Sequence, residues 1–304
     1  MSATIKDVAK KAGVSPSTVS RYLNDGYVSQ KNKDAIQEAM KSTGYTVNLT
    51  ARRLKTQSSK LIAVIVPRLD STSMIRTVNG MNEIFHEHGY QLVLIPKVKI
   101  IEDETDYINK IVSQGFDAIV ITAHHINEED VKLAERMSIP FIFVGQHHKD
   151  LTTYTINDYE VGEIMANYIN KLNPNKVLYV GVPESDHSVG HVRKKGFMEN
   201  VKPNTTAIEA DFAMQSAYEA LKTVKDLKSY DFVVGATDNI ALGAIRYLQE
   251  LNIKIPEEVQ VTGVGNYEVG VTLTPHLTTL DVSYETLGKQ VAEETLKKLE
   301  VKLE

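Results

Sequence analysis

Residues 4–25 restrict the fold of this chain strongly, because their pattern is that of two short helices joined by a tight turn. Thr4 is placed to cap the first helix, with Asp7 in its first turn. Gly13 suits the turn, and Ser15-Pro16 is a strong signal for the start of the second helix. The apolar positions that would pack the two helices together are Val8, Ala12, Val14, Val19 and Leu23. We therefore expect a helix-turn-helix at this end of the chain.

The outward face of the second helix carries short hydrogen-bonding side chains around one arginine and no acid. These residues are Ser17, Thr18, Ser20, Arg21 and Asn24. A helix-turn-helix that enters a DNA major groove needs such a face, on which Arg21 could hold a guanine edge through two hydrogen bonds. An ordinary helical hairpin with a solvated polar face is the alternative.

Charge is distributed unevenly along the 304 residues, whose formal net charge is −5. Residues 1–60 hold 11 Lys and Arg against 4 Asp and Glu, a balance of +7, and the other residues hold 23 against 35, a balance of −12. A basic head on an acidic body indicates that the head meets a polyanion. The absence of cysteine excludes disulfides and thiolate metal sites. With no secretion signal and no apolar run long enough for a membrane, we expect a soluble, cytoplasmic protein.

A third helix is predicted from Gln30 to about Ser42, capped by Ser29 and ended by Gly44. Three helices in fewer than fifty residues would make a small DNA-binding headpiece. Residues 47–59 then read as a linker in which Asn48 can cap a short helix, and Arg52 with Arg53 adds charge. A helix this short is marginal in water, so we expect it to be stable only against a partner surface.

From Leu61 onward, short apolar runs alternate with helical patterns. The runs are Leu61–Val66, Gln91–Ile95, Asp117–Thr122, Phe141–Val144, Lys176–Val180, Phe232–Gly235 and Val259–Val264. Strands buried on both faces and alternating with helices predict a parallel α/β sheet. The series breaks near residues 157–159, which predicts an α/β core of two doubly wound parallel-sheet lobes, similar to periplasmic binding proteins, with a ligand cleft beyond the carboxyl ends of the strands.

The predicted strand ends are rich in hydroxyls, histidines and amides rather than in one sign of charge. They are residues 67–74, His124-His125, residues 145–148, residues 183–193, Thr237-Asp238 and residues 265–267. This composition suits a neutral, polyhydroxylated ligand. Asp238 stands where a helix should begin, so a helix cap and a ligand contact are both open for it.

Taken together, these features resemble the lactose-repressor/galactose-repressor (LacI/GalR) family of bacterial transcription regulators over nearly the whole chain. The matching segments are residues 4–9, 12–15, 18–21, 28–29 and 61–64, Asn48, Ala51 and Leu54 in the linker, and in the core residues 193–197, 238–244, 275–279 and Gly288. The combination is far more specific than any single motif.

The resemblance implies a homodimer on a palindromic DNA operator, with paired linker helices in the minor groove and Leu54 as the wedge that kinks the DNA. It places base reading on Pro16, Ser17 and Arg21, of which Pro16 has no side-chain donor. The full DNA-binding prediction is Thr4, Ser15, Pro16, Ser17, Thr18, Ser20, Arg21, Asn24, Asn48, Ala51, Arg52 and Leu54.

For the core, the resemblance implies that Arg193 and Asp238 hold sugar hydroxyls and that the rings of Phe212 and Tyr284 pack on the ligand, although ordinary core packing is an equal alternative for the rings. The effector-binding prediction is Ser71, Thr72, Ser73, Met74, His124, Gln146, His187, Arg193, Phe212, Asp238, Asn266 and Tyr284. The predicted domains are a headpiece of residues 1–46, a hinge of residues 47–59 and a core of residues 60–304. Within the core, an N-lobe takes residues 60–157 and 284–304, and a C-lobe takes residues 158–283.

The chain departs from the family in three places. Gly263-Val-Gly265-Asn266-Tyr267 stands where relatives show glycine, an aromatic and then aspartate, and Gly145-Gln146 replaces a common Asp-Arg pair. The sequence ends at Glu304, before the tail that relatives usually carry, which indicates either a truncation or a different C-terminal edge. These departures leave the identity of the ligand open.

The predicted function is a repressor of a carbohydrate-utilisation operon, released from its operator by a small sugar or sugar phosphate. His187, His191, Lys194 and Lys195 keep a phosphate possible. An enzyme is disfavoured, because the glycines at 263, 265 and 270 lack dinucleotide-motif spacing and no nucleophile elbow or phosphate loop occurs. We expect no cofactor and no metal at the His124-His125 or His147-His148 pairs, and no membrane partner. Two alternatives are a regulator that answers a protein corepressor and a sugar-binding protein without a DNA role.

Overall fold

The computed structural model describes residues 3–23, 26–45, 58–97, 104–122 and 126–301. It divides into two compact units, residues 1–59 and residues 60–304. Among the described residues, no helix has both the length and the apolar content that a membrane crossing requires.

The first unit consists of helices α1 (Ile5–Ala12), α2 (Pro16–Leu23) and α3 (Gln30–Thr43). The expected capping of α1 is confirmed, because the Asp7 amide donates to Thr4 Oγ1 at 3.4 Å and the Thr4 amide donates to Asp7 Oδ2 at 2.9 Å. Gly13 takes the left-handed conformation that the turn requires, with φ at 65°. Ser29 precedes α3 as predicted, but its side chain makes no cap hydrogen bond. The small core contains Val8, Ala9, Val19, Val28, Ile36 and Ala39.

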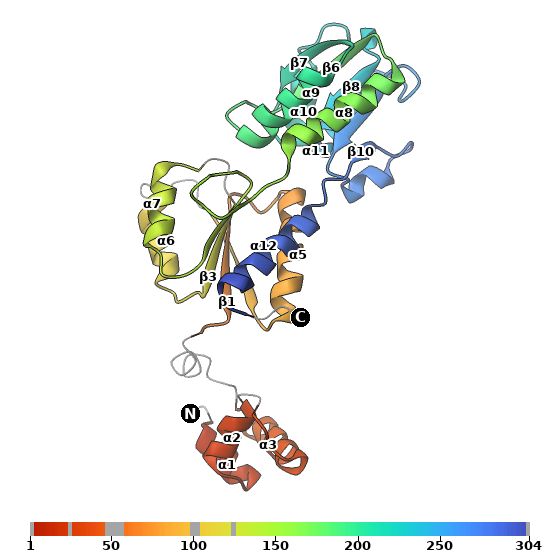
Figure 1. Cartoon of the computed structure of the whole chain (residues 1–304). Helices are drawn as coiled ribbons and strands as arrows, with labels where there is room; N and C mark the ends of the chain where they lie inside the picture. Colours follow the sequence, from red (N-terminus) through yellow and green to blue (C-terminus); the bar gives the residue numbers. More distant parts are fainter. Residues whose placement is uncertain (1–2, 24–25, 46–57, 98–103, 123–125, 302–304) are drawn as a thin grey trace. The chain divides into compact units, whose positions relative to one another are not determined.

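The second unit holds two five-stranded sheets in which every strand pairing is parallel, as the apolar runs predicted (Figure 1). The first sheet has the order β2-β1-β3-β4-β5. Its strands are β1 (Leu61–Val66), β2 (Gln91–Pro96), β3 (Ala118–Thr122), β4 (Phe141–Val144) and β5 (Thr153–Tyr154). Its helices are α5 (Thr72–Glu87), α6 (Glu104–Val112), α7 (Glu128–Arg136) and α12 (Tyr284–Lys298).

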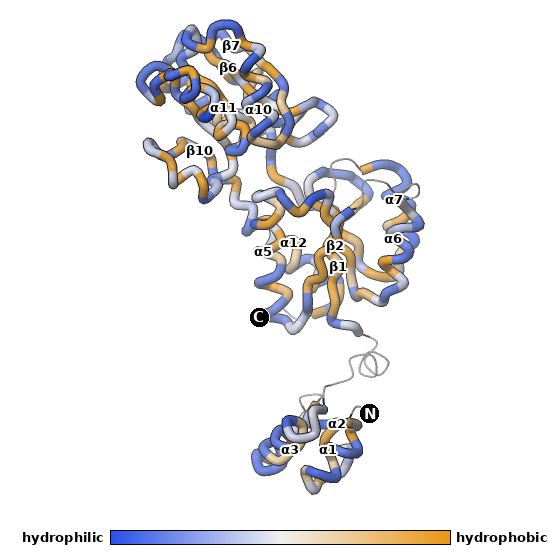
Figure 2. Tube along the Cα trace, turned by 180° about the vertical axis from the view of Figure 1, so that it is seen from behind, coloured by the Kyte–Doolittle hydropathy of each residue, from blue (hydrophilic) through white to orange (hydrophobic). Residues whose placement is uncertain are grey.

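Alternate residues of β1 face the two layers of helices that cover this sheet. Ile62 and Val64 pack in one apolar cluster with residues of α5 and α12, whereas Ala63 and Ile65 pack in another with residues of α6 and α7. Figure 2 shows β1 and β2 in the hydrophobic colour, with the hydrophilic colour on the outer turns of α6 and α7. Helix α12 therefore returns from the far end of the sequence to cover one face of the first sheet.

The second sheet has the order β10-β9-β8-β6-β7. Its strands are β6 (Lys176–Gly181), β7 (Asn204–Glu209), β8 (Phe232–Gly235), β9 (Gln260–Val264) and β10 (Thr278–Leu280). Its helices are α8 (Asp158–Leu172), α9 (Lys194–Asn200), α10 (Met214–Leu221) and α11 (Asp238–Glu250). A π-helix, η1 (His187–Arg193), leads directly into α9, and short 3₁₀ turns lie at Leu227–Ser229 and Glu268–Thr272. π-helical turns often occur at functional sites.

Candidate functional site

Helix α2 presents the residues that were predicted to read DNA. Ser15, Pro16, Ser17 and Arg21 are exposed, while Thr18 and Ser20 are half-buried. Ser15 Oγ accepts a hydrogen bond from the Thr18 amide at 3.1 Å, so Ser15 caps α2. Helix α2 carries no acidic residue that would repel phosphate.

The base of the Arg21 side chain lies against Gly26. The Gly26 amide donates to the Arg21 carbonyl at 2.9 Å, and a Cβ at residue 26 would press on Arg21 Cγ. Thr4, the remaining described member of the DNA-binding prediction, donates from Oγ1 to Asp7 at 2.7 Å in the α1 cap. The other predicted positions lie outside the described residues: Asn24, Asn48, Ala51, Arg52 and Leu54.

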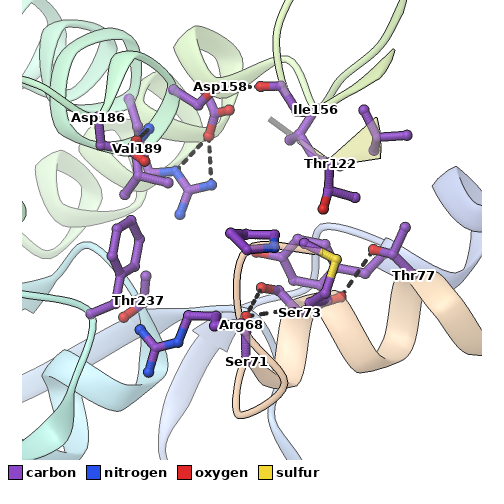
Figure 3. A pocket seen from close by; sticks show the side chains of 18 of the residues that line it. Arg68, Ser71, Ser73, Thr77, Thr122, Ile156, Asp158, Asp186, Val189 and Thr237 are labelled. Carbon is purple, nitrogen blue, oxygen red and sulfur yellow. Dashed lines mark hydrogen bonds and ion pairs between the residues drawn. The ribbon is translucent and has the colours of Figure 1, made fainter. Parts of the chain in front are cut away.

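A cavity of about 470 Å³ lies beyond the carboxyl ends of strands from both sheets in the second unit. Its first-sheet side is formed by the segment after β1, the start of α5, the ends of β3 and β4, and the start of α12. Its second-sheet side is formed by the segments after β6, β7, β8 and β9. In Figure 3, Asp158 and Asp186 lie on one side of this cavity, and Ser71, Ser73 and Thr77 lie on the other. The position agrees with the rule that ligands of parallel sheets bind outside the carboxyl strand ends.

Arg193 is the central cation of the cavity wall. Its side chain is 3% exposed, and Nε and Nη2 donate to Asp158 Oδ1 at 2.8 and 2.5 Å. Nη1 donates to the Ala236 carbonyl at 2.8 Å. Burial acts to lower the pKa of the guanidinium, but the neighbouring Asp158 carboxylate outweighs it, so the pKa is raised and Arg193 stays charged. Three segments of the second sheet's lobe therefore meet at one guanidinium.

Aromatic rings form part of the apolar wall. Phe212, Tyr267 and Tyr284 all line the cavity, and both tyrosines are buried. Burial raises the pKa of Tyr267 and of Tyr284, so both phenols remain neutral hydrogen-bonding groups. Flat apolar faces beside hydroxyls are the surface that a small polar ligand needs for both packing and orientation.

Six of the predicted effector residues line the cavity. They are Ser71, Ser73, Met74, Arg193, Phe212 and Tyr284. Five other predicted effector residues are described but do not line the cavity. Three of these five contact other residues or face solvent. Gln146 is buried, and its Oε1 accepts from the Ile126 amide at 3.2 Å. His187 is exposed with its ring stacked on His191, and Asn266 is exposed with its Nδ2 3.3 Å from Asp281 Oδ2. Thr72 opens α5 without lining the cavity, and His124 lies outside the described residues.

Asp238 is the fifth, and the structure places its carboxylate in contacts away from the cavity wall. The residue is fully buried, its Oδ2 accepts from the Tyr267 amide at 2.7 Å and its Oδ1 accepts from Thr279 Oγ1 at 2.5 Å. It is absent from the cavity wall, and the helix cap is Thr237 rather than Asp238. Burial raises the pKa of the Asp238 carboxyl, while the hydrogen bonds from Thr279 and Tyr267 act in the opposite direction. Asp238 therefore fixes the turn after β9 and positions Tyr267.

Several cavity residues were missing from the prediction. Asp158 is the carboxylate partner of Arg193, and its only sequence signal was an acid at the break between the two strand series. Arg68 pairs with Asp70 through two hydrogen bonds of 2.5 and 2.8 Å. Ser188 lies in η1 and donates to the Gly145 carbonyl at 2.6 Å, a contact between the two lobes. A second contact between the lobes joins Arg76 Nη1 to the Gly265 carbonyl at 2.7 Å.

The described residues contain no group of three His, Cys, Asp or Glu side chains that could hold a metal ion.

Comparison with known proteins assigns each unit. Residues 4–48 match a family model described as "Bacterial regulatory proteins, lacI family". Residues 59–302 match a model described as "Periplasmic binding proteins and sugar binding domain of LacI family". The sucrose operon repressor of Staphylococcus xylosus is 32% identical over 291 residues, covering 93% of this chain and 90% of that protein. The HTH-type transcriptional regulator TreR of Escherichia coli is 29% identical over 293 residues, covering 95% and 91%.

Solved structures show the same fold. The lac repressor dimer bound to operator and an anti-inducer matches with a TM-score of 0.83 at 21% identity, covering 98% of this chain and 92% of that chain. The trehalose repressor of Escherichia coli matches with a TM-score of 0.71 at 25% identity, covering 79% and 93%. Both relatives and both structures are named as repressors or transcriptional regulators.

Proposed function

Because this chain belongs to the LacI family of bacterial regulatory proteins, we propose that it is a sequence-specific, DNA-binding repressor of a carbohydrate-utilisation operon, released from its operator by a small sugar or sugar phosphate. The observation that carries the proposal is one chain that joins an exposed, acid-free α2 to a core with a cavity of about 470 Å³ at the strand ends. Relatives named for sucrose and trehalose regulation support the carbohydrate assignment.

On the DNA side, the proposal is a homodimer on a palindromic operator. Ser17 and Arg21 would read base edges from exposed positions on α2, and Gly26 would hold the base of the arginine side chain in place. The residues proposed for the hinge, with Leu54 as the minor-groove wedge, are supported by sequence alone.

On the effector side, a sugar in the cavity would change the angle between the two lobes and, through the hinge, the separation of the two headpieces. Residues on both sides of the cavity are available to contact a ligand, and such contacts would supply the differential affinity that this shift requires. Coupling between effector and operator of about 1–3 kcal/mol is the usual range for such systems. We propose induction rather than corepression.

Arg21→Ala tests the DNA-binding proposal. We expect the variant to lose about 1–3 kcal/mol of binding free energy on the cognate operator and to relax preference at one base pair in each half-site, because a bidentate contact to guanine is lost. Gel retardation of full-length protein on cognate and random duplexes measures both effects. Lys41→Ala, at an exposed position in α3, is the matched loss of charge, and we expect it to preserve base preference.

Two outcomes would contradict the proposal. Equal weakening of Arg21→Ala on cognate and random duplexes would show that Arg21 touches only phosphate. Operator binding that requires a protein corepressor, together with no response to any sugar, would assign the core to the alternative regulator.

A further inference from the structure

The charged residues of the cavity wall give it an excess of negative charge. Among the described residues, the wall includes two arginines and four aspartates, a formal balance of −2, and neither lysine nor histidine. These residues are Arg68, Asp70, Asp158, Asp186, Arg193 and Asp211. A small ligand that enters this cavity meets more carboxylate than cation.

Neither arginine offers an uncompensated charge. The Arg193 guanidinium uses three N–H groups on Asp158 and the Ala236 carbonyl. Arg68 holds Asp70 in a two-point ion pair at 2.5 and 2.8 Å. A phosphate that approached either guanidinium would have to displace a carboxylate that is already in contact, or share the cation with it.

Two further carboxylates are held by main-chain amides, which do not cancel their formal charge. Asp186 Oδ1 accepts from the Val189 and Gly190 amides at 2.7 and 3.3 Å. Asp211 Oδ1 accepts from the Phe212 amide at 2.7 Å. The hydrogen-bonded Asp70 carboxylate is the main cause of the raised pKa of Arg68, and the Asp211 charge acts in the same direction. Arg68 precedes α5 and Asp211 follows β7, so the negative field of the second sheet's lobe reaches the opposite wall of the cavity.

The basic residues that left a phosphate possible in the sequence, His187, His191, Lys194 and Lys195, do not line the cavity. Lys194 Nζ contacts Glu184 at 2.8 Å and Glu209 at 3.8 Å. His191 Nδ1 lies 4.0 Å from Glu184, and its ring stacks on His187. Lys195 Nζ lies 4.0 Å from Glu199, so none of these side chains contributes to the cavity wall.

Neutral groups make up the remaining polar wall. Hydroxyls of Ser71, Ser73 and Thr237 and the amide of Asn239 can orient a polyol, and Phe212 and Tyr284 supply apolar ring faces. The volume of about 470 Å³ suits one or two sugar rings.

From this wall we infer that the effector is a sugar without phosphate or carboxylate, and that the cavity selects against the phosphorylated form of the same sugar. The inference rests on the proposed function and deepens it, since either form was compatible with the sequence. Asp211 is the residue through which this selection can be changed, because it is exposed and held by one neighbouring amide.

The test compares matched pairs on the full-length protein: glucose with glucose 6-phosphate, sucrose with sucrose 6-phosphate, and trehalose with trehalose 6-phosphate. Thermal shift and operator release are recorded against concentration. In the pair that acts, we expect the phosphorylated sugar to require at least a tenfold higher concentration for the same effect. This factor corresponds to about 1.4 kcal/mol of binding free energy. Activity of the phosphorylated member at an equal or lower concentration would overturn the inference.

The Asp211→Lys variant gives a test that a loss of folding cannot imitate, because the variant should respond better to the phosphorylated sugar. We expect it to narrow the difference within the active pair at least tenfold, whereas Asp226→Lys, the same charge change away from the cavity wall, should leave the difference unchanged. An unchanged ratio in Asp211→Lys would overturn the inference.

A failure of the proposed function is distinguishable from a failure of the inference. If no pair acts on the unmodified protein, the sugar-regulator proposal falls. Binding of inorganic phosphate to the two lysine variants then tests separately whether the cavity repels anions. Tighter phosphate binding by Asp211→Lys than by Asp226→Lys supports a cavity that repels anions, and equal binding by the two variants contradicts it.

Discussion

Asp158 and Arg193 form a buried ion pair whose side chains are 7% and 3% exposed. Such a pair contributes little net stability relative to apolar residues of the same size, yet loss of one partner leaves a buried charge without compensation. Arg193 also holds the Ala236 carbonyl at the end of β8, so the pair joins the starts of α8 and α9 to the second sheet. An arginine in a ligand cavity is in this case also a structural residue.

Arg193→Ala should therefore lower the free energy of unfolding of the core by about 3–5 kcal/mol, because Asp158 is left buried and unpaired. The double variant Arg193→Ala with Asp158→Ala should recover a large part of that loss. Denaturant unfolding of both variants measures the difference. Unchanged stability in Arg193→Ala together with a lost sugar response would show that Arg193 serves the ligand alone.

Asp238 shows what the sequence could and could not predict about the site. Its position after β8 was correct, since the flanking residues Thr237 and Asn239 line the cavity. Successive residues at the start of a helix point in directions about 100° apart, so the position does not give the direction of one side chain. The burial of Asp238 depends on Tyr267 and Thr279, which are distant in sequence, and no local pattern reports such partners.

Three pairs of helices in the described core approach closely at glycines, and one of them is α10 with α11, where a Cβ at Gly243 would overlap the Met214 carbonyl. In the first lobe, a Cβ at Gly80 of α5 would overlap the Glu285 carbonyl, and a Cβ at Gly288 of α12 would overlap the Thr77 carbonyl. In the second lobe, a Cβ at Gly162 of α8 would overlap the Arg193 carbonyl. Glycine is thus required on both helices of the first pair, and the same contacts position Thr77 and Tyr284 at the cavity.

Gly288→Ala should destabilise the core by about 1–3 kcal/mol, because forcing α12 away from α5 costs more than the roughly 1 kcal/mol that alanine gains in a helix. Thr286→Ala, at an exposed position of the same helix, should change stability by less than about 0.5 kcal/mol. Urea unfolding of the two variants is the measurement. Equal midpoints would mean that the helices separate without cost.

Most of the strands that the sequence predicted are buried on both faces, such as β1 and β3, because continuous apolar runs report complete burial. The partly exposed edge strand β2 was also predicted, because its apolar run from Leu92 to Ile95 is unbroken. The edge strands β5, β7 and β10 were not predicted. β7 reads Asn-Thr-Thr-Ala-Ile-Glu and is largely exposed, while β5 has two residues and β10 has three. Such strands exist because a neighbouring strand offers hydrogen bonds, and this depends on tertiary structure rather than on local composition.

The first sheet is completed by two segments that are distant in the chain. Leu287, Val291 and Leu296 of α12 belong to the same apolar cluster as Ile62 and Val64 of β1. All the strands of the first sheet precede residue 158, whereas α12 begins at residue 284. The second sheet, in contrast, is formed entirely by residues between these two segments.

A chain truncated after Ser283 should keep the second sheet and lose the first, because one apolar face of the first sheet would be open to water. Hydrogen exchange should show protected amides in β6, β8 and β9 and fast exchange in β1, β3 and β4. Native-like protection of β1 and β3 in the truncated chain would show that α12 is dispensable.

Helix α12 also determines the order in which the two lobes of the core can fold during synthesis on the ribosome. The last strand of the first sheet ends at Tyr154, and the helix that covers the sheet begins at Tyr284. At about 5–20 residues per second, the intervening 129 residues take roughly 6–26 s to synthesise. During that interval the lobe made first waits with an apolar face exposed, and at its end the lobe made second has every residue it needs while α12 is still to come. Synthesis from the N-terminus would normally let the first-made lobe fold first, but here the second-made lobe can complete its fold before the first. The new chain is therefore most vulnerable to aggregation, and most in need of a chaperone, in the half that left the ribosome first.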